Sequence, residues 1–164
     1  MEPIQFVLAV SILLCSLVAG LVLTFAIIVM PGIKSLKDRD FLRAFVVMDR
    51  VIQNNHPVFM FVWLGSAAAV IVLAILAIWQ LDGVSRVVAI VLSAIYILGV
   101  QLPTIIINIP LNTLLQSLDL ESLNETQLAE ARMDFERRWN SWNLFRTVVA
   151  TVVASGLIIL AFRI

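Results

Sequence analysis

Long apolar runs, separated by short charged segments, dominate the pattern of the chain. Each of the three longest carries no charged residue and exceeds the roughly 20 residues that cross about 30 Å of hydrocarbon as a helix. They extend over Pro3 to Ile33, Pro57 to Leu81 and Val87 to Leu118. Met30-Pro31-Gly32 is expected to end the first, and Asp82-Gly83 is a short turn signal after the second. The pattern predicts membrane-spanning helices, the second and third joined as a tight hairpin.

The fourth span is predicted differently, because its apolar run is short. The residues from Thr147 to Phe162 fall about four residues short of a full span. The helix should therefore start earlier, near Trp139, and include Asn143 and Arg146 in its first turns. We predict an all-α integral membrane four-helix bundle, a single domain over residues 1–164, with spans at about 4–30, 57–80, 87–110 and 141–163.

The two long connections, residues 31–56 and 113–140, are expected to contain interfacial cytoplasmic helices. In the first, from about Ser35 to Asn54, apolar residues recur at helical spacing, at Phe41, Phe45, Met48 and Ile52. In the second, Asn124-Glu125 resembles a helix start within a strongly charged segment. We expect that segment to form a solvated helix leading into the fourth span.

Composition agrees with a membrane protein and makes the lipid bilayer the first expected partner. Of the 164 residues, 62% are hydrophobic and 13% charged, with a mean hydropathy of +1.05. Soluble proteins average about 45–50% apolar and about 25% charged residues. A formal net charge of zero, without a concentrated basic face, gives no indication of nucleic-acid binding. The single cysteine, Cys15, cannot form an intrachain disulfide. The sequence is also compatible with a homo-oligomer.

Lysine and arginine residues are unevenly divided between the two sides of the predicted bundle. Nine lie in the two long connections or just inside the fourth span: Lys34, Lys37, Arg39, Arg43, Arg50, Arg132, Arg137, Arg138 and Arg146. Only Arg86 and Arg163 fall on the other side. Because positively charged connections are retained in the cytoplasm, we predict a multi-pass protein with both long connections cytoplasmic and both termini outside.

A polar stripe runs along the end of the third span. Its members, three or four positions apart and so on one helix face, are Gln101, Thr104, Asn108 and Asn112. Each unsatisfied polar group in hydrocarbon costs several kcal/mol, so these side chains should face protein, water or a ligand. Pro103 and Pro110 interrupt the same segment and should kink it. The stripe is either a ligand site or a set of amides that hold helices together.

A second polar face lies at the start of the fourth span. Trp139, Asn143 and Arg146 are spaced by four and three residues and present an indole N–H, an amide and a guanidinium on one side. Arg146 is a candidate functional residue, with snorkelling to the surface as the alternative. Asp49 lies on the apolar stripe of the first connection, where we expect it to pair with Arg146 or else to reach headgroup water.

Most catalytic signatures are absent from the sequence. There is one histidine, His56, and no His-x-x-His or Glu-x-x-His pattern, so we predict no metal site. A structural or interfacial role for His56 competes with a role as a base. No phosphate-binding glycine loop or dinucleotide fingerprint is present either.

Several short motifs together resemble a family of small four-helix membrane proteins that includes the anthrone oxygenases of aromatic polyketide pathways. They are Met30-Pro31, Gln53-Asn54, Asn108-Ile-Pro-Leu-Asn112 and Trp139-x-x-Trp142-Asn143-x-x-Arg146-Thr147. The resemblance covers nearly the whole chain. It implies oxygenation of an electron-rich anthrone to an anthraquinone without a cofactor.

Such chemistry requires a base and hydrogen-bond donors for a developing oxyanion. Candidate catalytic residues are Asp49 or His56 as the base, and Arg146. Candidate substrate-binding donors are Asn108, Asn112, Trp139 and Asn143. We expect five of these groups to converge on one pocket near the cytoplasmic boundary that accepts an amphiphilic small molecule: Asp49, Asn108, Asn112, Asn143 and Arg146. The alternatives are a non-catalytic pocket for a lipid or quinone-like molecule, and a structural or assembly subunit.

Overall fold

The computed structural model describes residues 2–164, which form helices joined by short connections and no strand within that range. In chain order the elements are α1 (Pro3–Thr24), η1 (Phe25–Val29), α2 (Met30–Ile33), α3 (Asp38–Gln53), α4 (Pro57–Gln80), α5 (Gly83–Tyr96), η2 (Ile97–Gln101), η3 (Thr104–Asn108), α6 (Ile109–Gln116) and α7 (Glu125–Ala161), where η denotes a π-helix. They merge into four rods that are long and apolar enough to span a membrane: Pro3–Ile33, Pro57–Gln80, Gly83–Gln116 and Glu125–Ala161. The predicted integral membrane bundle is confirmed.

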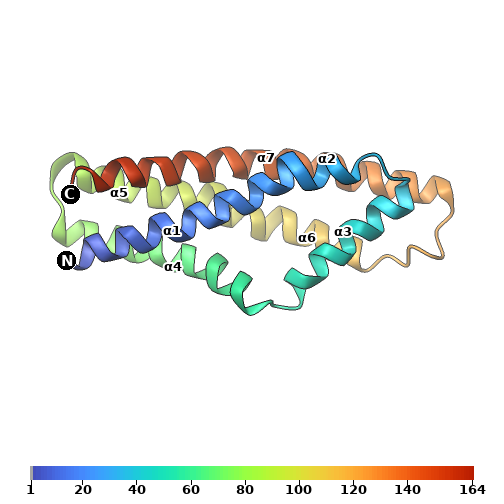
Figure 1. The fold of residues 1–164 in the computed structure, drawn as a ribbon, viewed down its shortest axis with the longest axis horizontal. Coiled ribbons are helices and arrows are strands. Elements are labelled where there is room, and N and C mark those ends of the chain that lie inside the picture. Colours follow the sequence, from blue (N-terminus) through green and yellow to red (C-terminus); the bar gives the residue numbers. More distant parts are fainter. Residues whose placement is uncertain (1) are drawn as a thin grey trace.

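Both chain ends lie at one end of the bundle, together with the turn between α4 and α5 (Figure 1). The Gln5 side-chain amide donates a 3.0 Å hydrogen bond to the carbonyl of Ile164 and ties the two termini together. Gly83 enters α5 at φ +53, a left-handed conformation that glycine adopts without strain. The two long connections lie at the opposite end (Figure 1).

The core of the bundle forms where α1 packs against α4 and α7, and α5 against α4 and α7. Fully buried side chains there include Val18, Val70, Tyr96 and Leu157. Helices approach closely at Gly99, where an added Cβ would lie 2.8 Å from Val149. Large apolar side chains also cover the outside, for example Phe61 at 70% exposure, as expected for a surface solvated by lipid.

The helix expected in the first connection is confirmed and lies within one turn of the predicted bounds. α3 folds back from the far end toward the middle of the bundle (Figure 1) and packs against α6 and α7. Its anchors Phe41, Leu42 and Phe45 are buried. Apolar and polar residues are strongly segregated onto different faces of α3, so this short helix can bury its apolar face against the bundle.

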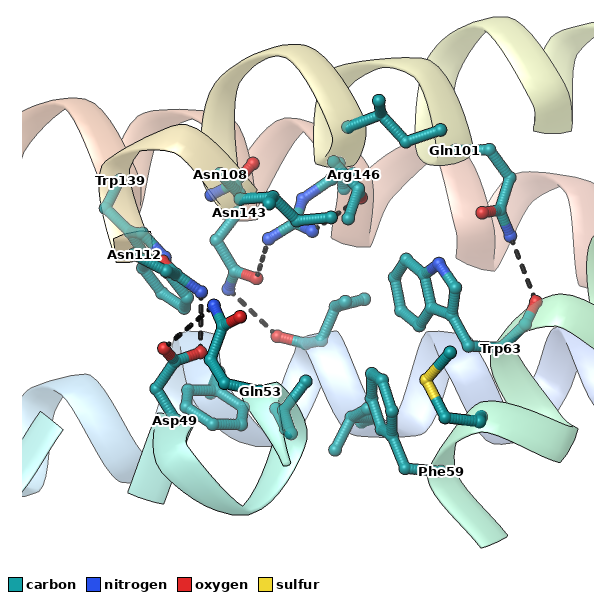
Figure 2. A pocket seen from close by; sticks show the side chains of 18 of the residues that line it. Asp49, Gln53, Phe59, Trp63, Gln101, Asn108, Asn112, Trp139, Asn143 and Arg146 are labelled. Atoms are coloured by element: carbon teal, nitrogen blue, oxygen red, sulfur yellow. Dashed lines mark hydrogen bonds between the residues drawn. The ribbon is translucent and has the colours of Figure 1, made fainter. Parts of the chain in front are cut away.

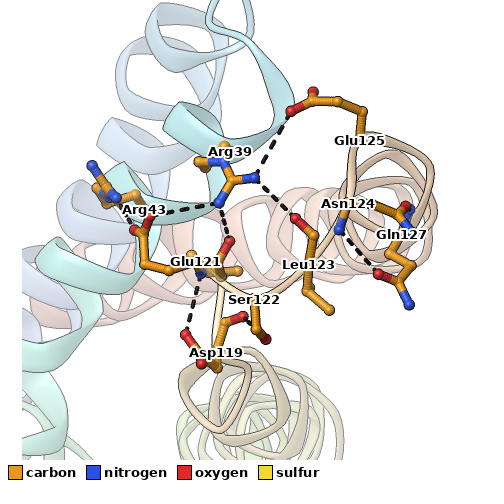
Figure 3. A network of polar contacts seen from close by, with 10 residues as sticks. Arg39, Arg43, Asp119, Glu121, Ser122, Leu123, Asn124, Glu125 and Gln127 are labelled. Atoms are coloured by element: carbon orange, nitrogen blue, oxygen red, sulfur yellow. Dashed lines mark hydrogen bonds and ion pairs between the residues drawn. The ribbon is translucent and has the colours of Figure 1, made fainter.

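Arginine side chains hold α3 against the second connection. Arg39 donates to the carbonyls of Leu120 and, at 2.9 Å, of Leu123, and lies 3.6 Å from a carboxylate oxygen of Glu121 (Figure 3). Arg43 pairs with Glu121 as well. Because these contacts join α3 to residues 117–124, they hold α3 in its position against the bundle.

The fourth rod is a single helix that begins much earlier than expected. The sequence placed its start near Trp139, whereas α7 runs without a break from Glu125. The N-cap is Asn124, whose side chain accepts from the Gln127 backbone at 3.0 Å in a capping box. The helix start suggested by Asn124-Glu125 is thus confirmed, and the solvated helix is continuous with the span.

Three π-helical turns interrupt the first and third rods, and each ends two residues before a proline. The pairs are Val29 and Pro31, Gln101 and Pro103, and Asn108 and Pro110. Proline lacks an N–H and crowds the carbonyl four residues earlier, and the wider π-turn accommodates this without ending the helix. The first helix therefore continues through Met30-Pro31-Gly32 to Ile33, where the sequence indicated an end.

Candidate functional site

A cavity of about 270 Å³ lies between the middle of the first rod, the end of α3, the start of α4 and the inner faces of η2, η3, α6 and α7. All three π-turns reach it, through Phe25, Gln101, Thr104 and Asn108. Polar groups gather on one side, whereas Phe59 and Trp63 lie on the other (Figure 2). These two rings are stacked, with centroids 5.6 Å apart and planes 16° from parallel. The cavity thus combines a flat aromatic wall with a polar wall.

The carboxylate of Asp49, only 3% exposed, is held by three amide side chains. Asn112 donates to one oxygen at 2.7 Å, while Gln116 and Gln53 donate to the other at 3.1 and 3.3 Å. Burial raises the pKa of the Asp49 carboxyl above its usual range, and the amide hydrogen bonds offset part of that rise. A carboxylate accepts about four hydrogen bonds, so the oxygen that Asn112 contacts has capacity for one more.

Trp139 fixes the orientation of Asn112. Its indole Nε1 donates to Asn112 Oδ1 at 2.8 Å, which turns the Asn112 amide N–H toward Asp49. The Trp139 ring is itself wedged by Phe45, at a centroid distance of 5.2 Å, and by Phe25 at 5.6 Å. Trp139 is therefore a buried group that positions Asn112, rather than an aromatic anchor at the membrane surface.

Arg146 is buried at 4% exposure in the membrane-spanning part of α7. Its Nη1 donates to Thr104 Oγ1 at 2.7 Å and its Nη2 to Asn143 Oδ1 at 3.0 Å, and Asn143 in turn donates to the carbonyl of Val22. Within residues 2–164, the third guanidinium nitrogen, Nε, is buried without a hydrogen-bond partner. The side chain therefore points inward and does not snorkel.

The expected ion pair between Asp49 and Arg146 is wrong. Among residues 2–164, no carboxylate forms a salt bridge with Arg146, and the Asp49 oxygens are occupied by amides. Both side chains nevertheless line the same cavity. The site thus holds one buried cation and one buried carboxyl group, each solvated separately by neutral dipoles.

Asn108 differs from the other asparagines of the site. It is 2% exposed and lines the cavity, yet neither its Nδ2 nor its Oδ1 has a hydrogen-bond partner in the part of the chain that the structure describes. A buried amide without partners costs about 1–3 kcal/mol. A group that binds in the cavity and offers both a donor and an acceptor would satisfy it.

The cavity ends at a second polar cluster around Gln101. Its amide donates to Ser66 Oγ at 3.2 Å and, more weakly, to the carbonyl of Trp63 at 3.4 Å. Ser66 also accepts a 2.8 Å hydrogen bond from Tyr96. At this end the stripe holds α4 and the third rod together, whereas at Asn108 and Asn112 it faces the cavity, so both interpretations of the stripe apply along its length.

The structure brings together six of the seven candidate residues and leaves one outside. Asp49, Asn108, Asn112, Trp139, Asn143 and Arg146 all line the cavity, whereas His56 is exposed at the N-cap position of α4 and is not part of the lining. Gln116 and Gln53 were missed as partners of Asp49. Gln116 follows Asn112 by four positions and simply extends the stripe. Within residues 2–164, no three His, Cys, Asp or Glu side chains gather as a metal site.

Comparisons with known proteins give one assignment. Neither the curated proteins nor the solved structures contain a match to this chain. A sequence model of one family, described as anthrone oxygenase, matches residues 50–156. The matched region includes η2, η3, α6 and most of α7, and thus Asn108, Asn112, Trp139, Asn143 and Arg146, while Asp49 lies one residue before it. Because the match extends over more than half of the chain, this protein belongs to the anthrone oxygenase family.

Proposed function

We propose that the cavity binds an anthrone or a similar polycyclic carbon acid and converts its methylene group to a carbonyl with dioxygen. The observation that carries the proposal is Arg146, a buried cation without a counter-ion that lines the same cavity as a buried carboxyl group. A buried unpaired charge is expensive, so it marks a place where a ligand of opposite charge forms or binds.

The overall reaction consumes one dioxygen and releases one water. Asp49 removes a proton from the methylene carbon, and the electron pair delocalises onto the ring carbonyl as an enolate. The enolate carbon then reacts with dioxygen, and the peroxide anion that forms there takes up the proton held by Asp49, which regenerates the carboxylate. Loss of the second methylene hydrogen as a proton, with cleavage of the O–O bond, leaves the new carbonyl and water. The substrate is oxidised, and dioxygen is the oxidant.

Asp49 suits the role of base because burial raises the pKa of its carboxyl, which brings its proton affinity closer to that of a weak carbon acid. The amides of Asn112, Gln116 and Gln53 hold the carboxylate in one orientation. His56, the other candidate base, is exposed and outside the lining, so we assign it no catalytic role.

Arg146 and Asn108 suit the developing oxyanion. The Nε of Arg146 and the Nδ2 of Asn108 are buried donors without partners, and preorganised donors of this kind favour the charged intermediate over the neutral substrate. The stacked Phe59 and Trp63 rings would give a polycycle an apolar, aromatic contact surface opposite this polar wall.

The test is oxygen uptake by the purified protein in lipid nanodiscs supplied with an anthrone, with anthraquinone followed by absorbance and the uncatalysed oxidation subtracted. We expect equal amounts of oxygen consumed and quinone formed. Asp49→Asn and Arg146→Met should each lower the rate by roughly 10²-fold or more, as for loss of a general base or an oxyanion donor. Matched controls are Asp82→Asn and Arg86→Met, a surface pair at the other end of the bundle.

The result that would overturn the proposal is a wild-type rate no greater than that of Asp49→Asn. If the anthraquinone still bound under those conditions, the protein would be a non-catalytic pocket for a quinone-like molecule. Unchanged activity in Arg146→Met would instead refute the assignment of the oxyanion site.

A further inference from the structure

We infer that the substrate reaches the cavity sideways from the bilayer, as an uncharged molecule, through an apolar opening between α4 and the η3–α6 segment. This inference rests on the proposed function. It specifies the substrate class, a neutral carbon acid dissolved in lipid that becomes an anion only inside the protein.

The opening is identified by residues that line the cavity and are exposed outside at the same time. Leu64 of α4 is 57% exposed, Ile105 of η3 is 58% exposed and Ile109 of α6 is 43% exposed, and all three belong to the cavity lining. A side chain that satisfies both conditions lies at the boundary between the cavity and the surface. The adjacent Ile106 is equally exposed, at 56%, but does not line the cavity.

Helix packing accounts for a gap at this place. α4 packs extensively against α1 and α5, whereas η3 packs against α7, and α6 packs against α3 and α7. The two π-turns before Pro103 and Pro110 redirect the third rod along this stretch. In addition, the chain turns between α3 and α4, where Asn55 adopts φ +55.

The depth of the opening places it in lipid. At about 1.5 Å per residue, the 24 residues of α4 span about 36 Å, which is close to the thickness of a bilayer core of about 30 Å plus its margins. Leu64 lies about two turns inside the start of α4, so the rim is below the headgroups. Its aliphatic side chains offer no hydrogen bond to a charged group. A neutral polycycle can pass such a rim, and an anion cannot without a large desolvation cost.

This arrangement separates the charged groups from the route of access. When Asp49 takes the proton, its negative charge moves to the substrate oxygen beside Arg146, so the net charge of the site is unchanged. The anion is then retained by the same apolar rim that admitted the neutral molecule. Exposed amides near the end of α3, Gln53 and Asn55, also line the cavity and provide a polar path for the water product toward the interface.

The experiment blocks the opening reversibly and measures binding rather than turnover. Leu64→Cys and Ile105→Cys variants are labelled through a disulfide with a bulky aromatic methanethiosulfonate. Ile71→Cys and Ile106→Cys serve as matched controls on the same helical segments, because Ile71 and Ile106 are exposed but do not line the cavity. The native Cys15 is fully buried, and the labelled wild type checks that it does not react. Anthraquinone is the probe, and its quenching of tryptophan fluorescence in nanodiscs gives the association and dissociation rates.

We expect labelling at residues 64 and 105 to slow association and dissociation alike by about tenfold or more, with Kd changed by less than about twofold, because a blocked route affects both directions equally. Reduction of the label should restore both rates, and association should follow the probe-to-lipid ratio rather than the aqueous concentration. Equal rates with labels at 105 and 106 would overturn the lateral route while leaving the proposed function intact. Absence of saturable quenching in the wild type would instead refute the proposed function, and this inference with it.

Discussion

Arg146 donates a 2.7 Å hydrogen bond to Thr104 and forms no salt bridge or hydrogen bond with Asp49, although both charged side chains line one cavity. Each is held by neutral groups that belong to different elements, so the space between them is free for a ligand. An ion pair in the same place would stabilise the protein but would leave neither group available for chemistry.

The separation predicts additive effects on stability. Arg146→Met and Asp49→Asn, alone and combined, should change the free energy of unfolding additively within about 0.5 kcal/mol, as for residues without shared partners. Thermal melts of the ligand-free protein in detergent would give the double-mutant cycle. A coupling of about 2 kcal/mol or more would show that the two charges interact directly and would contradict the arrangement described.

The buried carboxyl group predicts a stability that falls as the pH rises. Because burial raises the pKa of Asp49 in the folded state, the folded protein binds more protons than the unfolded chain above the unfolded pKa of about 3.9. This contribution is fully present below that pH and is lost as the pH rises through the folded pKa. Activity should change in the opposite direction, because only the carboxylate accepts the proton.

Melting temperatures of the wild type and of Asp49→Asn are measured from about pH 4 to about pH 8. The wild-type value minus the Asp49→Asn value at each pH gives the contribution of this single group. The difference should decline with rising pH. A difference curve that rises instead would mean that the three amides stabilise the carboxylate more than burial destabilises it.

The orientation in the membrane remains a prediction from nine basic residues against two. The structure places the termini together and the long connections at the other end (Figure 1). A reporter fused after Ile164 should therefore show external behaviour, whereas one inserted after Ser122 should show cytoplasmic behaviour. Cytoplasmic activity of the first reporter would reverse the orientation of the whole bundle.

Much of the fold follows from sequence because three of the four apolar runs are longer than the bilayer requires and the fourth falls only about four residues short. The amphipathic spacing of Phe41 and Phe45 likewise predicts α3. The π-turns before Pro31, Pro103 and Pro110 could not be predicted, since a proline can equally end or kink a helix. The sequence changes from charged to apolar residues within α7, and this change suggested a helix boundary. Both kinds of residue are compatible with the same helix, so the backbone continues without a break.

The sequence predicts which polar residues of the site share a helix face. It does not predict which of them are hydrogen-bonded to each other. Spacing alone places Asn108 and Asn112 on one helix face, and Asn143 and Arg146 on another. It does not tell which element lies opposite, and there the expectation failed: Asn112 and Gln116, not Arg146, face Asp49. The opposite charges of Asp49 and Arg146 suggest an ion pair from sequence alone. The way in which the helices cross determines which side chains are in contact.

The two asparagines of the Asn-x-Pro-x-Asn motif predict opposite effects on stability. Asn112 bridges two buried groups, accepting from Trp139 and donating to Asp49 at 2.8 and 2.7 Å. Asn112→Leu would leave both without that partner and should lower the free energy of unfolding by about 1–3 kcal/mol. Asn108 has no partner to lose, so Asn108→Leu removes a buried unsatisfied amide and should raise the stability by about 1 kcal/mol.

Binding should separate the two asparagines as well. We expect Asn108→Leu to weaken anthraquinone binding in nanodiscs by about tenfold, the loss of one buried hydrogen bond of about 1.4 kcal/mol, while its melting temperature rises. A gain in stability with a loss of binding is the behaviour of a residue retained for a ligand, because its unpaired groups destabilise the empty protein. If Asn108→Leu proves as destabilising as Asn112→Leu, the Asn108 amide is already satisfied in the ligand-free protein, and Arg146 alone remains to hold the oxyanion.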